Sequence, residues 1–264
     1  MVAILPREGS YIVYLWSMTS VTTKGRKFAL VLPSTNTSVE REFHHLRPQD
    51  CSWHTGRIMI KAPALHSANA FQAFRECLNE ALPSALETVM TCEPDYIVMG
   101  MSAETFWGGV PGNAAFEQGV RELTGLEVTT GATAAGEALR AFGAKRIGIV
   151  TPYQPVGDEQ VVAYFTELGY DVAAITGLCS ASATSIADET PETLRNAFLS
   201  VDGPDVDALI QCGTNLECIA VAAELEKELG KPVIAINLAT MWHAFRTNGI
   251  DDRIAGHGSL LELH

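Results

Sequence analysis

One arrangement of residue types occurs twice in this chain, and it limits the folds that the chain can adopt. The segment RKFALVLPSTN, which begins at Arg26, resembles KRIGIVTPYQ, which begins at Lys145. In both, a basic pair precedes an apolar run and a turn that contains proline. DYIVMGMSAE from Asp95 resembles DALIQCGTNLE from Asp207 in the same way. The repeat predicts two similar lobes that face each other, although doubly wound proteins with one sheet also show such likenesses.

Short apolar runs alternate with longer segments in which apolar residues recur at helical spacing. The short runs predict buried parallel strands at residues 28–32, 96–99, 147–150, 208–210 and 233–236. The longer segments predict helices at residues 69–91, 113–124, 132–142, 160–168, 191–199 and 216–229. This alternation predicts an α/β fold in which helices flank each parallel sheet.

The repeat and the pattern divide the chain into four parts. We expect a leader at residues 1–23, an N-terminal α/β lobe at 24–143, a second α/β lobe at 144–240, and a C-terminal helix or tail at 241–264 that returns to the first lobe. Residues 11–18 of the leader are apolar, but they are too few to span a bilayer and lack the basic flank of a signal peptide. An exposed apolar stretch of this kind is compatible with a homo-oligomer.

Charge and cysteine usage narrow the class of protein. The net charge of −13 argues against a nucleic-acid or membrane partner, because an acidic surface repels phosphate groups. It still permits a small anionic ligand where local donors gather. The six cysteines form no CxxC pair, which is typical of reduced thiols in a cytoplasmic protein. The histidines show no metal-ligand spacing and no GxGxxG or Walker loop is present, so we expect neither a metal nor a cofactor.

Four turns follow the predicted strands, and ligands of parallel sheets bind beyond the carboxyl ends of strands. The first turn contains Thr35 and Asn36, and after it Thr37 and Glu40 match a capping box. A helix that begins there would point free N–H groups at the cleft and form an anion site. The alternative is a well-capped helix without a ligand.

The fourth turn begins with Cys212, which Gly213 and Thr214 follow. If this turn opens a helix, the helix dipole would stabilise the thiolate of Cys212, whereas burial would favour the thiol. Packing in the core is the alternative role for this cysteine. The second and third turns supply Ser102 and Tyr153 as candidate hydrogen-bond donors to a carboxylate.

The second turn also supplies apolar residues. We expect Gly100, Met101, Phe106 and Trp107 to lie at the pocket, where the two aromatic rings would form a dry wall. An aromatic loop without a binding role is the alternative.

Together, the four turns resemble those of the aspartate/glutamate racemase superfamily, in the branch of maleate cis-trans isomerases and arylmalonate decarboxylases. The segment LPSTNTSVE resembles the carboxylate-binding first turn of the isomerases, which implies that Asn36 contacts the ligand. TPY, which ends at Tyr153, and Cys212 with Gly213 resemble segments of both families, and VMGMS, which ends at Ser102, resembles the decarboxylases. The resemblance implies two pseudo-symmetric lobes with the active site in the cleft between them.

This sequence differs from the family pattern at two positions. The racemases and isomerases use a second cysteine from the first lobe. Gly100 stands at the corresponding position in this chain, and the decarboxylases also have glycine there. We therefore expect no efficient two-base racemisation. A threonine that donates a hydrogen bond to the enediolate in the decarboxylases corresponds to Met101.

We therefore expect a cofactor-independent enzyme that acts on a small mono- or dicarboxylate through an enediolate-type intermediate. Cys212 would be its one catalytic cysteine, and the activity would be of the arylmalonate decarboxylase type. A maleate-type cis-trans isomerase or a racemase-like isomerase is the alternative if Cys212 reacts as a thiolate. A protein that binds carboxylates without catalysis is the third hypothesis.

Overall fold

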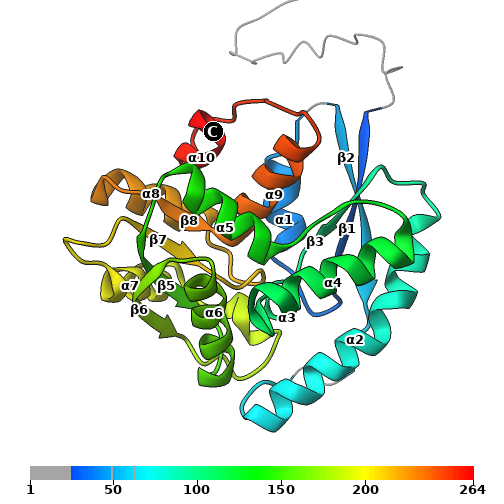
Figure 1. Ribbon diagram of the computed structural model, residues 1–264, viewed down its shortest axis with the longest axis horizontal. Helices are drawn as coiled ribbons and strands as arrows, with labels where there is room; N and C mark the ends of the chain where they lie inside the picture. The colour runs from blue at the N-terminus through cyan, green and yellow to red at the C-terminus, as the bar shows by residue number, and fades with distance from the viewer. Residues whose placement is uncertain (1–24, 49, 62–63) are drawn as a thin grey trace, which may run out of the picture.

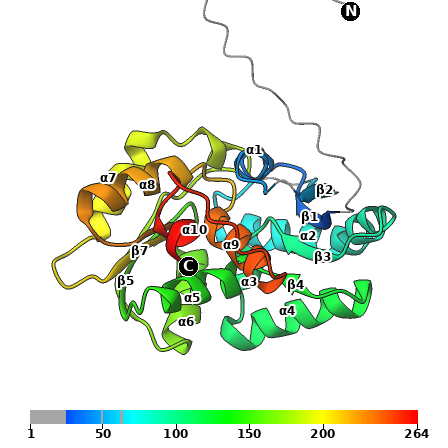
Figure 2. The same cartoon turned by 90° about the horizontal axis from the view of Figure 1, so that it is seen from above.

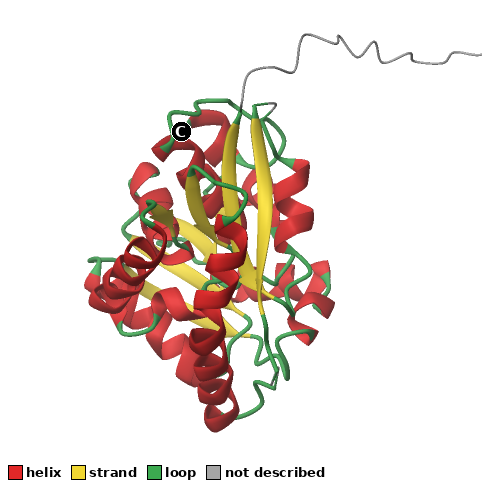
Figure 3. Cartoon of the chain, turned by 90° about the vertical axis from the view of Figure 1, so that its right-hand side faces the viewer, coloured by secondary structure: helices red, strands yellow, loops and turns green. Residues whose placement is uncertain are grey.

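The strands of the chain form two separate four-stranded parallel sheets (Figures 1 and 3). The computed structural model describes residues 25–48, 50–61 and 64–264, so the predicted leader lies outside the described part. The first sheet has the order β2-β1-β3-β4, with β1 at Arg26–Pro33, β2 at Cys51–Ile58, β3 at Tyr96–Met99 and β4 at Val128–Thr129. The second has the order β6-β5-β7-β8, with β5 at Arg146–Thr151, β6 at Asp171–Gly177, β7 at Ala208–Gln211 and β8 at Val233–Ala235. The shared strand order confirms the two similar halves.

The repeated aspartates have the same structural role in both halves. Asp95 Oδ2 accepts the N–H of Lys27 at the start of β1, at 2.8 Å. Asp207 Oδ2 accepts the N–H groups of Lys145 and Arg146 at the start of β5, each at 2.8 Å. The N–H groups of Arg146 and Lys145 hold the pKa of Asp207 below its usual range. Each aspartate therefore ties the two central strands of its sheet together.

The predicted strands correspond to β1, β3, β5, β7 and β8, and the sequence pattern missed β2, β4 and β6. The four central strands β1, β3, β5 and β7 are buried along nearly their whole length, as expected for parallel strands covered on both faces. By contrast, β2 and β6 are edge strands with partly exposed residues, so they lack a continuous apolar run.

Helices cover the outer faces of both sheets (Figure 3). They are α1 (Val39–His45), α2 (Ala68–Met90), α3 (Ala103–Phe106), α4 (Gly109–Thr124), α5 (Gly131–Ala141), α6 (Pro155–Glu167), α7 (Pro191–Val201), α8 (Ile219–Leu229), α9 (Ile236–Thr247) and α10 (Ser259–Leu263), with the 3-10 turn η1 (Ser185–Asp188). The six predicted helices are found as α2 and α4 to α8. No described helix is both long enough and apolar enough to cross a membrane.

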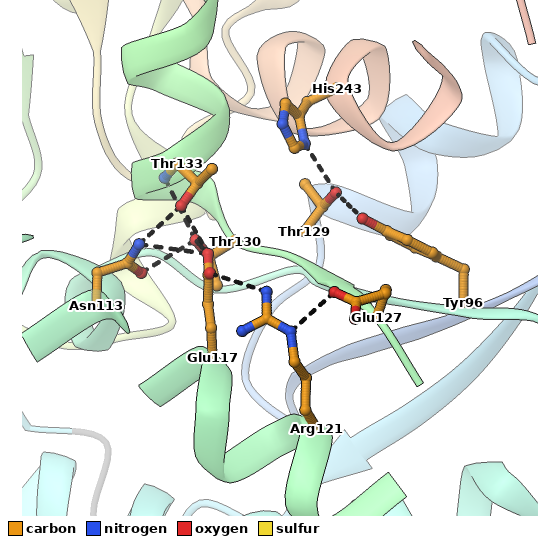
Figure 4. A network of polar contacts seen from close by, with 9 residues as sticks. All are labelled: Tyr96, Asn113, Glu117, Arg121, Glu127, Thr129, Thr130, Thr133 and His243. Carbon is orange, nitrogen blue, oxygen red and sulfur yellow. Dashed lines mark hydrogen bonds and ion pairs between the residues drawn. The ribbon is translucent and has the colours of Figure 1, made fainter. Parts of the chain in front are cut away.

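Helix α9 links the two halves of the molecule. It follows β8 directly and packs against α1, α5, β3 and β4 of the first half (Figures 1 and 2). On α9, His243 Nδ1 lies 2.9 Å from Thr129 Oγ1, which lies 3.1 Å from the hydroxyl of Tyr96 (Figure 4). Burial lowers the pKa of His243, so the ring is neutral near pH 7. The lobe boundaries named above remain predictions.

A second polar network fixes the start of α5 beside the turn after β3. Glu117 Oε1 on α4 accepts hydrogen bonds from the hydroxyls of Thr130 and Thr133, at 2.9 and 2.6 Å (Figure 4). One N–H of α5 donates to Thr105 Oγ1 at 3.2 Å, and that hydroxyl donates to the carbonyl of Ser102 at 2.7 Å. The hydroxyl of Thr105 therefore connects the backbone of Ser102 to the start of α5.

Candidate active site

A pocket lies where the turns after β1, β3, β5 and β7 meet. Its polar lining comes from those turns, and its apolar lining comes mainly from α2 and the segment that precedes it. The lining residues are Pro33, Thr35, Asn36, Leu65, Phe71, Phe74, Leu78, Met101, Ser102, Ala103, Glu104, Pro152, Tyr153, Ala183, Ile186, Gly213, Thr214 and Asn215. Of the predicted site residues, Thr35, Asn36, Ser102, Tyr153, Gly213, Thr214 and Met101 all lie at this one pocket.

Asn36 is 2% exposed and connects the first turn to the fourth. Its Oδ1 accepts the N–H groups of Ser38 and Val39 at 3.1 and 3.0 Å, so the side chain caps α1. Its Nδ2 donates to Thr214 Oγ1 at 3.3 Å. Because an amide NH2 group has two hydrogens, Asn36 retains a donor for a ligand at the pocket.

The prediction of an anion site at the start of α1 is wrong. Helix α1 begins after Ser38 with no side-chain cap from its own N-terminal residue, and no capping box joins Thr37 to Glu40. Instead, Asn215 Oδ1 accepts the N–H groups of Thr37 and Ser38, at 2.9 and 3.3 Å. The side-chain oxygens of two asparagines therefore occupy the helix start where an anion was expected.

Ser102 and Tyr153 meet across the pocket. Ser102 Oγ lies 2.8 Å from the hydroxyl of Tyr153, and it also accepts the N–H of Thr214 at 3.2 Å. Burial raises the pKa of Tyr153, although its hydrogen bond with Ser102 opposes the shift. Tyr153 is therefore a neutral phenol that can donate a hydrogen bond. Donors from three turns thus form one compact cluster.

Cys212 is completely buried at the end of β7, directly before two residues that line the pocket. Its N–H donates to the carbonyl of Val150 at 2.8 Å, which continues the pairing of β7 with β5. The next residue must be glycine, because a Cβ at Gly213 would lie 2.3 Å from Cδ of Pro152. Cys212 is therefore not itself a lining residue, although it lies close enough to Tyr153, which lines the pocket, for the two groups to interact electrostatically.

Cys212 does not lie at the N-terminus of a helix, so no helix dipole stabilises its thiolate. We expected the turn after β7 to open a helix, but α8 begins only at Ile219, and Cys218 is its N-cap residue. Burial raises the pKa of Cys212 well above its usual value, and the nearby charge of Asp158 adds to the shift. Cys212 is therefore a thiol near neutral pH, which is the form that a proton donor requires.

Three residues predicted at the pocket do not line it. Phe106 packs in the core, with its ring centroid 5.3 Å from that of Tyr164. Trp107 lies outside the pocket and stacks on Phe71, whose ring also contacts that of Tyr153. A Cβ at Gly100 would point at aliphatic side chains of the first half, with the nearest atoms at 3.1 Å. The dry wall predicted from these aromatic rings is instead formed by other residues.

The sequence pattern missed the apolar wall. Phe71, Phe74 and Leu78 of α2 face the pocket, with Leu65 and Ile186. Their spacing on α2 predicted only a buried helix face, and it cannot show what that face covers. It also missed Glu104, a lining residue whose Oε1 accepts from Arg75 Nε at 3.0 Å. Burial raises the pKa of Glu104, and the charge of Arg75 opposes this.

Within the described ranges, no three His, Cys, Asp or Glu side chains are grouped as a metal site.

Comparisons with known proteins give two kinds of relative. The maleate isomerase of Nocardia farcinica is 29% identical over 247 residues, which cover 89% of this chain and 95% of that protein. The arylmalonate decarboxylase of Bordetella bronchiseptica is 34% identical over 158 residues, which cover 58% of this chain and 64% of that protein.

A solved structure shows the same architecture. It is a Nocardia farcinica maleate cis-trans isomerase, in the form of a cysteine-to-serine mutant with a covalently bound succinylcysteine intermediate. It superposes with a TM-score of 0.83 and 26% identity, and the match covers 90% of this chain and 99% of that one. In addition, the family model described as arylmalonate decarboxylase matches residues 56–261, which is most of the chain. The chain therefore belongs to the arylmalonate decarboxylase family.

Proposed function

We propose that this protein is a cofactor-independent decarboxylase of a small malonate that bears an apolar substituent, with Cys212 as its proton donor. The observation that supports this most is the cluster of Ser102, Tyr153 and the N–H of Thr214 in a pocket that also has an apolar wall. These groups would hold one carboxylate of the substrate.

The donor cluster would lower the barrier by stabilising the enediolate. When the second carboxylate leaves as CO2, its bonding electrons form an enediolate on the carboxylate that remains. Ser102, Tyr153 and the N–H of Gly213 would hydrogen-bond the developing charge, while the N–H of Thr214 holds Ser102 Oγ in place. Each such donor typically lowers the barrier by about 2.7–4 kcal/mol. Asn36 would orient the carboxylate through its remaining amide hydrogen.

The apolar wall would favour departure of CO2. A carboxylate against Phe71, Phe74 and Leu78 has few groups to solvate it, whereas neutral CO2 needs none. Cys212 would then transfer its S–H proton to the α-carbon, and the thiolate would regain a proton from solvent. The raised pKa of the buried thiol supports this role, because an acid must begin in its protonated form.

Maleate cis-trans isomerisation is the second candidate. It is favoured by the likeness to the Nocardia farcinica maleate isomerase over nearly the whole chain. That reaction would require the Cys212 thiolate to add to an alkene, and burial of the thiol disfavours the thiolate. The described residues that line the pocket include no cysteine, which also disfavours racemisation by two cysteine bases.

A substrate panel followed by NMR in D2O separates these reactions. We would offer phenylmalonate, alkylmalonates, maleate and 2-arylpropionates to the full chain. We expect malonates to lose CO2 and to gain one deuterium at the α-carbon. Formation of fumarate from maleate as the main reaction would overturn the proposal in favour of the isomerase. If no compound reacts but malonate raises the melting temperature, the protein binds carboxylates without catalysis.

A further inference from the structure

A single buried carboxylate from the first half anchors the turn of residues 212–218 in the second half. Glu42 lies on α1 and is 6% exposed. Its Oε1 accepts the N–H groups of Cys218 and Ile219 at 2.9 and 3.0 Å. These groups lie where the turn ends and α8 begins. One oxygen of Glu42 therefore fixes the far end of the turn that carries the thiol.

The other oxygen of Glu42 acts on the start of the same turn through Asn237. Asn237 Nδ2 donates to Glu42 Oε2 at 2.6 Å and to the carbonyl of Thr214 at 2.9 Å. The N–H of Thr214 in turn donates to Ser102 Oγ at 3.2 Å, inside the donor cluster. Two hydrogen bonds therefore connect Glu42 to a residue that lines the pocket, and neither bond involves a pocket-lining side chain.

We propose that Glu42 is a positioning residue, which holds the turn so that the N–H of Thr214 keeps its hydrogen bond to Ser102 Oγ in the donor cluster. This rests on the proposed function, because the position of the donor cluster affects turnover only if the cluster holds a reacting carboxylate. Glu42 itself does not line the pocket and touches no substrate in this scheme.

The contacts require a carboxylate rather than an amide. Three N–H donors, from Cys218, Ile219 and Asn237, converge on two acceptor oxygens. A glutamine at position 42 has one such oxygen and would turn its NH2 group towards the NH2 group of Asn237. Reversing Asn237 would repair that contact. However, it would place Asn237 Oδ1, which has no partner among the described residues, against the carbonyl of Thr214.

Stability alone does not explain a carboxylate at this position. Burial raises the pKa of Glu42 to about 7, and the hydrogen bonds from Ile219, Asn237 and Cys218 oppose that shift only in part. Buried charges are often replaced by apolar residues without loss of stability. An acid that lies buried in spite of this cost is consistent with a need for its two fixed acceptor oxygens.

The test compares Glu42→Gln with Glu217→Gln. Glu217 also joins α1 to the turn, because its carboxylate pairs with Arg41 at 3.0 Å, but this pair is exposed. On the malonate with the highest turnover, we expect Glu42→Gln to lower kcat about 10- to 100-fold, as misplaced groups do, while KM changes less than about threefold. Amide hydrogen exchange should become faster at Thr214, Cys218 and Ile219. Glu217→Gln should keep kcat within about twofold, as exposed sites usually do.

Asn237→Ala removes the hydrogen bonds that connect Glu42 to the carbonyl of Thr214, but it leaves those from Cys218 and Ile219 to Glu42 in place. It should lower kcat in the same direction and speed exchange at Thr214, but not at Cys218 or Ile219. It also keeps the test decisive if Glu42→Gln does not fold. A folded Glu42→Gln variant with wild-type kcat, or with wild-type exchange at all three amides, overturns the positioning role.

The outcome also distinguishes this inference from the proposed function. If the wild-type chain turns over no compound of the panel, the proposed function fails and malonate binding replaces kcat as the measurement. Binding that is about tenfold weaker in Glu42→Gln than in Glu217→Gln then supports the positioning of the turn. Equal binding by the two variants refutes it.

Discussion

Ser102, after the last strand residue of β3, and Tyr153, after the end of β5, share a hydrogen bond of 2.8 Å although they belong to different sheets. The N–H of Thr214, after β7, joins the same serine oxygen. Three turns from the two halves are therefore held in one hydrogen-bonded cluster before any substrate arrives. Donors that are already in place stabilise a developing charge without reorganising, and this makes each of them testable by a small substitution.

Removing the hydroxyl of Tyr153 should slow the reaction without unfolding the protein. We expect Tyr153→Phe to lower kcat for a malonate by roughly 100-fold, since one donor to the enediolate is lost. The free energy of unfolding should change by only about 1 kcal/mol, the usual contribution of one hydrogen bond. Tyr170→Phe is the control, because it removes a hydroxyl that donates to the carbonyl of Gly136, away from the pocket. Equal rates for the two variants would exclude Tyr153 from the cluster that holds the substrate.

Cys212→Ser should nearly abolish turnover. A serine hydroxyl is a far weaker acid than a thiol, so we expect kcat to fall about 1,000-fold, within the range for loss of a general acid. Cys179→Ser is the matched control, because Cys179 is exposed. Steady-state rates and melting temperatures of both variants give the measurement. Wild-type rates in a folded Cys212→Ser protein would end the cysteine mechanism.

Asp158 should make the protein less stable as the pH rises from about 4 to about 6. Burial raises the pKa of Asp158 from 3.8 to about 6, and a hydrogen bond from Thr151 opposes the shift. The folded chain therefore binds this proton more tightly than the unfolded chain, and stability falls as the pH rises through that window. Asp158→Asn should be more stable than the wild type at pH 7 and no more stable at pH 4.

Urea unfolding at pH 4, 5, 6 and 7 tests this prediction. Asp251→Asn serves as the control, because Asp251 is exposed. Parallel stability curves for the wild type and Asp158→Asn across these pH values would show that Asp158 titrates normally in the folded chain.

Met101→Thr should increase decarboxylation. Met101 lines the pocket beside Ser102 and is 2% exposed, at the position where the resemblance implies a donating threonine in decarboxylases. A new hydroxyl donor should raise kcat/KM for phenylmalonate by about tenfold, which is less than the full contribution of an evolved donor. Met101→Val has the shape of threonine without the hydroxyl. If valine and threonine give the same rate, the gain comes from space and not from a hydrogen bond.

Much of the fold could be predicted because burial leaves a local trace in the sequence. The central strands β1, β3, β5 and β7 are continuous apolar runs, since both faces of a parallel sheet are covered. The repeat of Asp95 and Asp207 marked equivalent strands in the two halves, and each aspartate binds the neighbouring strand in the same way. Edge strands such as β2 and β6 left no such trace, because many of their residues are partly exposed.

For the candidate site, the positions of the residues could likewise be predicted from local pattern, whereas their contacts could not. The local pattern was enough to predict which turns follow the buried strands, and therefore that Asn36, Ser102, Tyr153 and Cys212 lie at strand ends that meet in space. The contacts of those groups could be read only from the folded structure. Asn215 accepts hydrogen bonds at the start of α1, 178 residues earlier in the chain, and Glu42 accepts an N–H at the start of α8. Periodicity reports whether a residue is buried, because burial follows from the local helix or strand. The partner of a buried polar group depends on how distant elements pack, and no local pattern encodes that.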